Sequence, residues 1–296
     1  MTKPIECPVC EWPPDGEEHW QCTCGHAWNT FDTKGKCPSC NFQWEETYCP
    51  ACGQTSPHND WYSGAMKPGT DDGPETIHLK IKKKKLEARL ISLGIKNYRI
   101  GHLPYLDHTK EEFQNPYDVG CRLVILSAIS YSVHKLENRL KIIHWLKIEE
   151  LWDKVSEKEK EFFTDQQPTE ETRIALSWRL ESALVLGWAL DLIDNIHSID
   201  NEGTDDEINT FMNYVPELGE STKEFLSNVS YRSLEEIYEE NLLNEMATTY
   251  FRDLLFNGKE DETQINRAVS FERHYSLNWV RKFSGISEWD ETDTST

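Results

Sequence analysis

Eight of the nine cysteines lie within the first 52 residues, and this clustering constrains the fold more than any other feature of the sequence. They form four close pairs, three of the form Cys-x-x-Cys and one tighter pair, Cys22-Thr-Cys24. Such a pair puts two thiolates on one turn, and two turns close a tetrahedral Zn²⁺ site, as in zinc ribbons. The sequence therefore predicts two structural zinc ions with the ligands Cys7, Cys10, Cys22, Cys24, Cys37, Cys40, Cys49 and Cys52.

Spacing leaves the pairing of these ligands open. The sequential arrangement, which we favour from the sequence, joins Cys7/Cys10 to Cys22/Cys24 and Cys37/Cys40 to Cys49/Cys52, with a short hairpin carrying Trp44 between the last two pairs. A nested arrangement joins Cys22/Cys24 to Cys37/Cys40 across a second candidate hairpin, and a cross-braced arrangement is the third.

Other chemistries are compatible with the same residues. A disulfide framework is one alternative, although nothing marks the chain as secreted and a reducing cytosol disfavours disulfides. Iron at one site is another, and His26 or His58 could replace one cysteine near the tight Cys22/Cys24 pair. Four thiolates fill the tetrahedron and leave no open position for water, so the zinc is predicted to be structural rather than catalytic.

The first sixty residues hold few aliphatic side chains, so metal binding must supply most of their folding free energy, about 10–16 kcal/mol per site in zinc-finger peptides. We expect the tryptophans of this segment to pack over the zinc turns; an exposed aromatic patch for a partner is the alternative. These residues are Trp12, Trp20, Trp28, Trp44 and Trp61.

The charge of the chain bears on its partners. The sequence holds 31 Lys and Arg against 52 Asp and Glu, a net charge of −21, with a pI of about 4.9. Phosphate contacts need a cationic surface, so we expect no binding to nucleic acid or to anionic membranes. There is no long apolar run and no signal-peptide pattern at the start, so we expect a cytoplasmic protein.

After a predicted linker at residues 61–76, rich in Pro, Gly, Ser and Asp, helical periodicity dominates. Asn115 or Asp118 can cap one helix, and Ser156 with Glu159 forms a capping box for another. The longest helix is expected to open at Pro168-Thr169 and run through ETRIALSWRLESALVLGWALDLID; it is apolar on nearly all faces in its second half, which predicts a central position.

The predicted fold class is mainly α: an all-α helical bundle body at residues 77–296, preceded by a small β-hairpin double zinc-ribbon domain at residues 1–60. Further long amphipathic stretches run from Ser233 to Phe256 and from Thr263 to Phe283. Cys121 lies on an apolar face and is predicted to be a core residue.

Several elements of the body carry a resemblance to a known family. They are Gly94-Ile95 with Leu103-Pro104, Leu151-Trp152 before Ser156-Glu157-Lys158-Glu159, Trp178-Arg179-Leu180-Glu181 leading into Trp188-Ala189-Leu190, Glu272-Arg273-His274-Tyr275-Ser276-Leu277-Asn278-Trp279, and Trp289-Asp290-Glu291-Thr292-Asp293-Thr294. On these residues the body resembles the bacterial, uncharacterised family named domain of unknown function 4272, which implies a helical fold and no established activity. The chain departs from that family at Leu242–Tyr250, where the usual Arg- and His-bearing stretch is missing.

Charged and polar residues inside apolar helices are the remaining candidates for a functional site. They are Arg179, Glu181, Glu272, Arg273, His274 and Asn278. Burying such charges unpaired costs several kcal/mol, so we expect a structural ion-pair network that joins helices. The alternative is a catalytic cleft with His274 as general base and Arg273 as anion clamp. Established catalytic motifs are absent from the sequence, and the acidic run Glu235/Glu236/Glu239/Glu240 is predicted to face solvent.

The polar tail is expected to dock through Trp289, which would contribute about 2–3 kcal/mol if buried. Asp290 and Asp293 would then meet Arg179, Arg273 or Arg281.

The sequence thus predicts a non-catalytic zinc protein that acts through protein–protein contact. Because the chain is strongly acidic, a basic protein is the partner that suits it best. The alternatives are an enzyme with a site between the Arg179/Glu181 and Glu272–Asn278 helices, and an acidic immunity-like protein that neutralises a basic partner.

Overall fold

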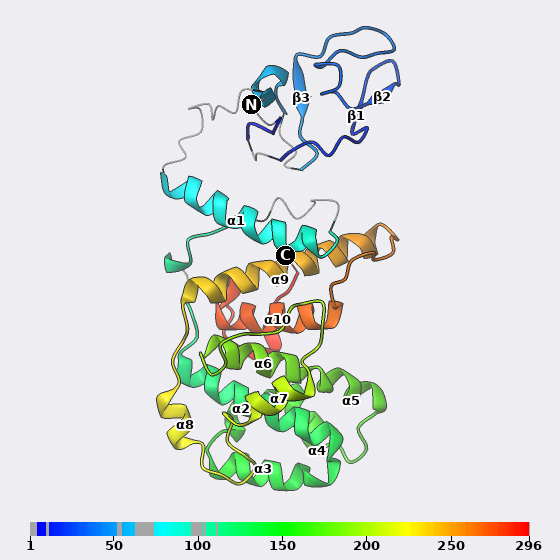
Figure 1. Cartoon of the computed structure of the whole chain (residues 1–296). Helices are drawn as coiled ribbons and strands as arrows, with labels where there is room; N and C mark the ends of the chain where they lie inside the picture. Colours follow the sequence, from blue (N-terminus) through cyan, green and yellow to red (C-terminus); the bar gives the residue numbers. More distant parts are fainter. Residues whose placement is uncertain are drawn as a thin grey trace. The chain divides into compact units, whose positions relative to one another are not determined.

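The structure is a computed structural model that describes residues 5–9, 12–51, 55–62, 74–95, 103, 105–110 and 112–295. The chain divides into two compact units, one formed by Met1–Lys82 with Lys96–Pro104 and the other by Lys83–Ile95 with Tyr105–Thr296. The predicted class is confirmed, because helices dominate and the described strands are short hairpin strands near the N-terminus (Figure 1). Most of the predicted linker lies outside the described residues.

The first unit is built on two short antiparallel hairpins. Its elements are β1 (Trp20–Gln21), β2 (Ala27–Trp28), β3 (Glu46–Tyr48), β4 (Thr55–Pro57) and η1 (His58–Tyr62). β1 pairs with β2 and β3 with β4. The strands flank cysteine pairs instead of lying between them, which differs from the predicted hairpins. Gly25, with φ of +87°, lets the chain reverse directly after Cys24, so that the strands on either side of this pair meet.

Aromatic rings and cysteines form the core of this unit in two clusters. Phe31 and Trp61 pack with Cys7 and Cys49, while Trp28 packs with Cys22 and Cys37. Trp28 and Trp61 are buried, and the other three tryptophans of the segment are half-buried. The expectation that these tryptophans pack over the cysteine turns is therefore confirmed. Sulfur atoms and aromatic rings thus form the core of this unit, in place of the aliphatic side chains that its sequence lacks.

α1 (Pro74–Ser92) begins in the first unit and ends in the second. The other α-helices belong to the second unit, the helical body: α2 (Pro116–His134), α3 (Arg139–Ile148), α4 (Glu157–Thr164), α5 (Glu170–Ser177), α6 (Arg179–Ala189), α7 (Asp205–Met212), α8 (Lys223–Asn228), α9 (Leu234–Phe256) and α10 (Arg267–Val280). Its short 3₁₀ segments are η3 (His108–Lys110), η4 (Leu136–Asn138), η5 (Trp152–Lys154), η6 (Phe283–Gly285) and η7 (Trp289–Glu291). The predicted caps are confirmed: Asn115 accepts from the Tyr117 amide, and Ser156 with Glu159 forms a capping box.

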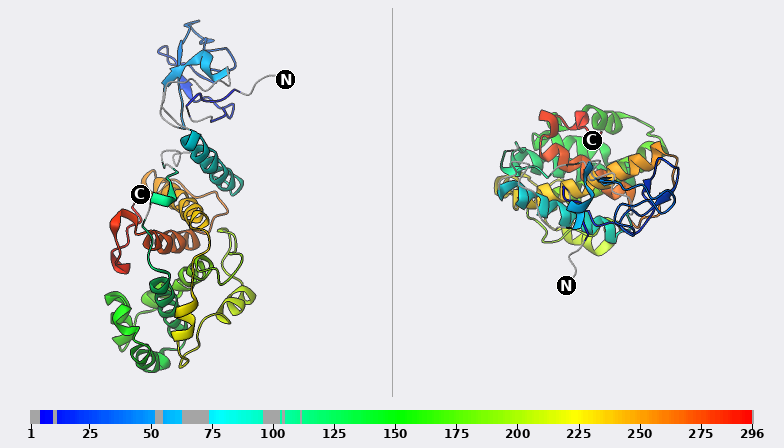
Figure 2. Two further views of the ribbon diagram at one scale, coloured as in Figure 1. Left: turned by 90° about the vertical axis from the view of Figure 1, so that its left-hand side faces the viewer. Right: turned by 90° about the horizontal axis from the view of Figure 1, so that it is seen from above.

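Four helices form the centre of the body. α9 packs on α10, α10 on α6, and α6 on α2, so that the four lie in this order through the unit (Figures 1 and 2). α6 is buried along most of its length, which confirms the central position predicted for the apolar half of this segment. α2 is buried over nearly all of its surface as well, because its sequence offers no polar stripe.

The prediction of one long helix after Pro168-Thr169 is wrong, because this segment forms two helices, α5 and α6, that are separated at Trp178. Trp178 keeps right-handed helical dihedrals, φ −64° and ψ −16°, between the two helices, and the Ser177 hydroxyl beside it donates to the Ile174 carbonyl at 2.7 Å. α6 then ends at Ala189 rather than near residue 194, since Asp191 adopts φ of +58° and the Leu192 amide donates to the Gly187 carbonyl.

The C-terminal tail docks on the body through Trp289, which is 4% exposed. Its indole packs edge-on against Tyr275, and the guanidinium groups of Arg122 and Arg179 lie 4.9 and 5.8 Å from its centre. The tail carboxylates accept hydrogen bonds from backbone and hydroxyl groups, and Asp290 lines a groove together with Arg179. The Asp290 carboxylate accepts from the Lys158 amide, and that of Asp293 accepts from Ser295.

Replacing Trp289 with alanine is expected to destabilise the body by about 3–5 kcal/mol, because a large buried aromatic side chain and its cation–π contacts are lost. Thermal unfolding of the full chain checks this, and faster amide exchange at Asp293–Ser295 should accompany it. Leu255→Ala, at a side chain that is 74% exposed, is the control and should change little. Equal effects of the two changes would contradict a docked tail.

Candidate metal centre and buried polar network

Four cysteines from two turns of the first unit converge. The Sγ atoms of Cys22, Cys24, Cys37 and Cys40 all lie within 4.8 Å of one another. The Sγ atoms of Cys22 and Cys40 are 3.6 Å apart, and those of Cys24 and Cys37 are 3.7 Å apart. Four sulfurs bound to one zinc ion at about 2.3 Å lie about 3.8 Å from one another, so this group has the size of a Zn(Cys)₄ centre.

Hydrogen bonds from the backbone orient these sulfurs. A hydrogen bond from the Cys24 backbone is the main cause that lowers the pKa of the Cys22 thiol, to about 6. The Phe42 backbone makes the same kind of bond to Cys40, yet burial and the three neighbouring sulfurs raise the pKa of Cys40 to about 12. Four neighbouring thiols do not all ionise without a compensating charge, and a bound metal ion would supply the positive charge that lets all four become thiolates.

The structure decides between the pairings for these four residues. Cys22/Cys24 meet Cys37/Cys40, as in the nested arrangement, and the sequential arrangement is wrong for them. None of the four cysteines of this group is in a disulfide, so the disulfide alternative does not hold for these four residues. The histidine alternatives are also wrong at this group. His26 stacks on Trp28, and both ring nitrogens of His58 are engaged, by the Thr47 and Tyr62 hydroxyls.

A second cysteine turn has the same construction. The Cys37 amide donates to the carbonyl of Phe42, five residues on, and the Cys7 amide donates to the carbonyl of Trp12, also five residues on, in both cases at 2.9 Å. The Val9 amide also points at the Cys7 sulfur, at 3.4 Å. Cys7 and Cys49 are both fully buried in one cluster. The other two predicted ligands, Cys10 and Cys52, lie outside the described residues.

The ninth cysteine, Cys121, is fully buried in α2, as predicted, and burial raises the pKa of its thiol to about 11. It therefore takes no part in the cysteine group of the first unit.

The candidate residues of the helical body form ion pairs between helices. Glu272 of α10 accepts from Arg179 at 2.8 Å and from the Ser182 hydroxyl at 2.5 Å, both on α6. Arg273 lies 3.5 Å from Glu240 of α9 and 3.9 Å from Glu181 of α6. These pairs tie α6, α10 and α9 together, which is the arrangement expected of a structural network.

His274 is enclosed and has no access to solvent. Its Nδ1 lies 2.7 Å from the Thr248 hydroxyl and its Nε2 3.0 Å from the side-chain nitrogen of Asn278. Asn278 also donates to the Asp293 carbonyl of the tail and accepts from Asn241. Because both ring nitrogens are occupied within the protein, the geometry favours a structural role for His274 over that of a general base.

The environment of His274 predicts a pH dependence of stability. Burial is the main cause that lowers the pKa of its imidazole, from 6.5 to about 3. Between these values the unfolded chain takes up a proton that the folded body does not, so stability falls as the pH decreases from about 6.5 towards 3, by up to about 1.4 kcal/mol per pH unit. Urea unfolding at a series of pH values measures this slope, and His274→Asn should flatten it. Parallel profiles for the two proteins would contradict the assignment.

Buried polar residues of α9 that the sequence did not single out also belong to this network. The buried polar residues of α9 are Glu240, Asn241, Asn244, Glu245 and Thr248. The prediction that Glu240 faces solvent is wrong, since this side chain is 5% exposed and lies against Arg273 and Arg89. The sequence signal for this was the spacing of Asn241, Asn244 and Thr248 along one helical face. Uncharged polar side chains of this kind can form hydrogen bonds in a buried contact between helices as well as on a solvent-exposed face.

Comparison with known proteins identifies the body only at the level of a family. No curated protein and no solved structure gives a significant match to the chain. None of the described helices is long and apolar enough to cross a membrane. Residues 82–292 match the family described as "Domain of unknown function (DUF4272)", in agreement with the resemblance seen in the sequence. Since this match covers most of the chain, the protein belongs to the DUF4272 family.

Proposed function

We propose that this protein is a cytoplasmic, non-catalytic zinc protein that acts through protein–protein contact. The observation that supports this most is the four-cysteine group, whose sulfur separations suit one tetrahedral zinc ion. Four thiolates leave no coordination position for water or substrate, so the metal serves to hold the turns. Where bound, it would supply the folding free energy of a unit that has little aliphatic core.

The proposal includes a second zinc ion. The turn at Cys7 repeats the backbone hydrogen bond of the turn at Cys37, and Cys49 is buried in the same cluster as Cys7. In the sequence Cys10 follows Cys7, and Cys52 follows Cys49, at the same spacing as Cys40 follows Cys37. The nested pairing of the inner four cysteines leaves these outer four as the ligands of the second ion.

The partner in this proposal is a basic protein. A net charge of −21 favours association with positively charged surfaces and opposes contact with nucleic acid. An immunity-like role, in which an acidic protein covers a basic one, is a specialisation of the same interaction. The enzyme alternative receives no support from the buried network, whose charged groups pair between helices.

Native mass spectrometry of the purified full chain tests the metal part of the proposal. We expect two zinc ions per chain, and loss of one of them in Cys37→Ser. A metal-free chain with a protease-resistant first unit would overturn it. Partner capture with the wild type and with Cys37→Ser then tests the role of the first unit. A partner held only by the wild type supports an interaction through this unit, and salt-dependent binding of DNA or RNA would contradict the proposal.

A further inference from the structure

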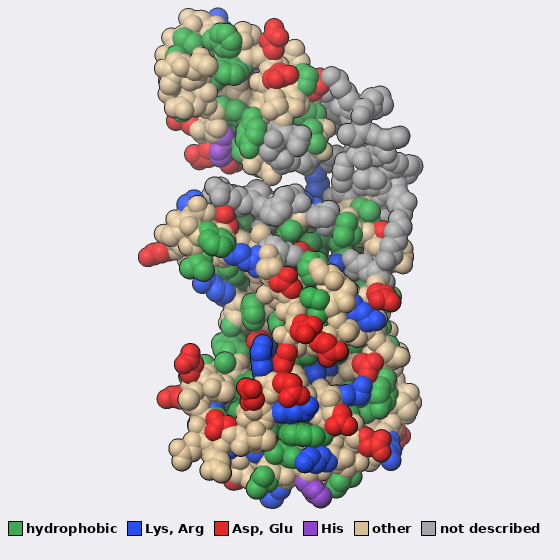
Figure 3. All heavy atoms as spheres, turned by 180° about the vertical axis from the view of Figure 1, so that it is seen from behind, with side chains coloured by type: hydrophobic (Ala, Val, Ile, Leu, Met, Phe, Trp, Pro, Cys, Tyr) green, Lys and Arg blue, Asp and Glu red, His purple; other side chains and the backbone are tan. Residues whose placement is uncertain are grey.

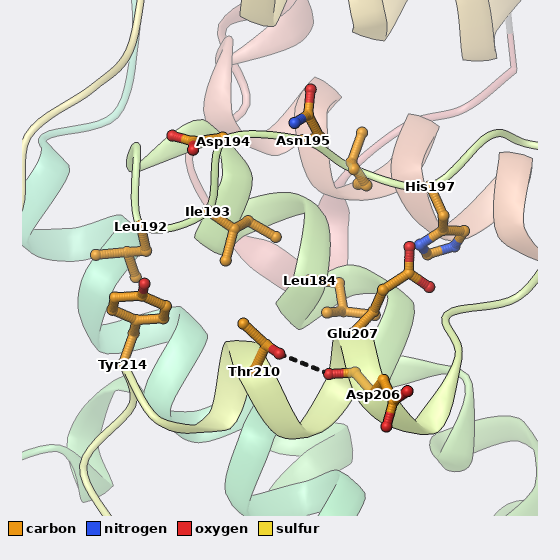
Figure 4. Close-up of a pocket in the computed structure, with 11 residues that line it drawn as sticks. Leu184, Leu192, Ile193, Asp194, Asn195, His197, Asp206, Glu207, Thr210 and Tyr214 are labelled. Atoms are coloured by element: carbon orange, nitrogen blue, oxygen red, sulfur yellow. Dashed lines mark hydrogen bonds between the residues drawn. The ribbon is translucent and has the colours of Figure 1, made fainter.

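A groove of about 410 Å³ opens on the helical body beside α7 (Figure 4). One side is formed by the segment that follows α6, from Leu192 to His197, and the other by α7 and Tyr214. This volume lies near the lower end of the range of small-ligand sites, about 300–1,000 Å³, and suits one extended side chain better than a large ligand.

The groove combines an aliphatic floor with a carboxylate rim. Leu184, Leu192, Ile193 and Ile196 supply the apolar part of its lining. The rim carries three exposed acidic residues, Asp194, Asp206 and Glu207. This combination matches a long alkyl stem that ends in a positive charge, since lysine and arginine lay their stems on apolar surface and keep the charged end near water or carboxylates.

The lining of the groove includes no lysine or arginine. Its one histidine is His197, whose side chain is 7% exposed. The Nε2 atom of His197 lies 3.0 Å from the carboxylate of Glu181, which belongs to the buried network. Glu207 accepts from the Thr204 amide and hydroxyl, and these bonds lower the pKa of its carboxyl, which keeps it ionised. Figure 4 shows the Glu207 carboxylate directed towards His197 at one end of the groove.

A second groove of the same volume provides a contrast. It lies beside α4 and α5, and its lining mixes Glu161, Glu171 and Asp290 with Lys158 and Arg179. The body surface drawn in Figure 3 likewise shows acidic and basic side chains interspersed. The lining of the groove beside α7 therefore differs from that of the second groove in holding carboxylates and no lysine or arginine, while Arg232 lies outside it, on the backbone carbonyls of Ile193 and Asp194.

We propose that the groove beside α7 binds a lysine or arginine side chain of a basic peptide, with the alkyl stem on Ile193 and Ile196 and the charged end at the carboxylate rim. This inference rests on the proposed function, because it assigns the basic partner a contact surface on the body. It is independent of the cysteine turns, so the two proposals fail separately.

Titration of the zinc-loaded full chain with an acetylated hexalysine peptide at low salt tests the inference. The test variant is Asp194→Asn/Asp206→Asn, at rim residues with exposed side chains. The control is Glu161→Gln/Glu171→Gln in the second groove, which removes the same charge from the same body. Exposed ion pairs are worth little individually, so we expect the rim variant to weaken binding by about three- to ten-fold and the control by less than about two-fold.

Methyl NMR signals of Ile193 and Ile196 should shift on titration, and thermal unfolding should show that both variants remain folded. Equal weakening in the two variants would overturn the inference in favour of diffuse attraction to an acidic protein, as would a lack of hexalysine binding to the wild type. If either result came with two bound zinc ions and partner capture through the first unit, only the groove assignment would fail. A metal-free chain that still bound hexalysine through the rim would remove the proposed function and leave the groove.

Discussion

The full chain with Cys37 exchanged for serine is expected to lose one zinc ion and the folded β1–β2 hairpin. Cys37 is fully buried and lies in the group of four sulfurs that meets between two turns. Zinc binding in finger peptides contributes about 10–16 kcal/mol, which is at least comparable to the whole stability of a typical small domain. Native mass spectrometry counts the ions, and amide exchange at Trp28 reports whether β2 is still paired.

Cys121→Ala is the matched control for this change. Cys121 is also a fully buried cysteine, but it lies in α2 of the helical body. We expect the same zinc content as the wild type and unchanged exchange at Trp28. A stable, zinc-replete hairpin in Cys37→Ser would show that the aromatic cluster, rather than the metal, holds this unit together.

The second large effect is expected at Arg273, which is 1% exposed and lies between Glu181 and Glu240. Arg273→Ala removes the buried cation that Glu181 and Glu240 share, a change that costs about 3–5 kcal/mol. For a domain of about 200 residues this corresponds to a decrease in Tm of roughly 6–20 °C. Differential scanning calorimetry of the full chain, following the transition of the body, measures it.

Arg89→Ala provides the comparison, because Arg89 lies 3.5 Å from the same Glu240 but its side chain is 55% exposed. A solvent-exposed partner of this kind contributes about 0–1 kcal/mol, so the Tm should change by no more than a few degrees. Similar decreases for the two variants would mean that the position of Arg273 between the helices has no special importance.

The sequence predicts the chemistry of the first unit better than its connectivity. Paired cysteines near aromatic residues indicate a metal centre, because few other chemistries use such spacing. Which pair meets which depends on where the chain reverses, and Gly25 places a reversal within the Cys22/Cys24 turn itself. Spacing does not encode that choice, since the nested and sequential arrangements have hairpins of similar length.

In the body, the apolar periodicity of α2 and α6 predicts a helical core and its central members, because burial follows hydrophobicity directly. The division at Trp178 was not predictable in this way, because apolar residues continue through both α5 and α6. The burial of Glu240 was also missed. A glutamate is expected at the surface unless a cation pairs with it, and the sequence does not show that Arg273 faces Glu240 from another helix.

The stacking of α6 between α2 and α10 has a practical consequence for truncation. α2 is buried on nearly every side, and α6, which covers much of it, follows some fifty residues later in the chain. A fragment that stops before Arg179 would expose to water the apolar surface of α2 that α6 covers, and it should precipitate on expression. Libraries of nested deletions would therefore yield soluble protein only where both helices are retained.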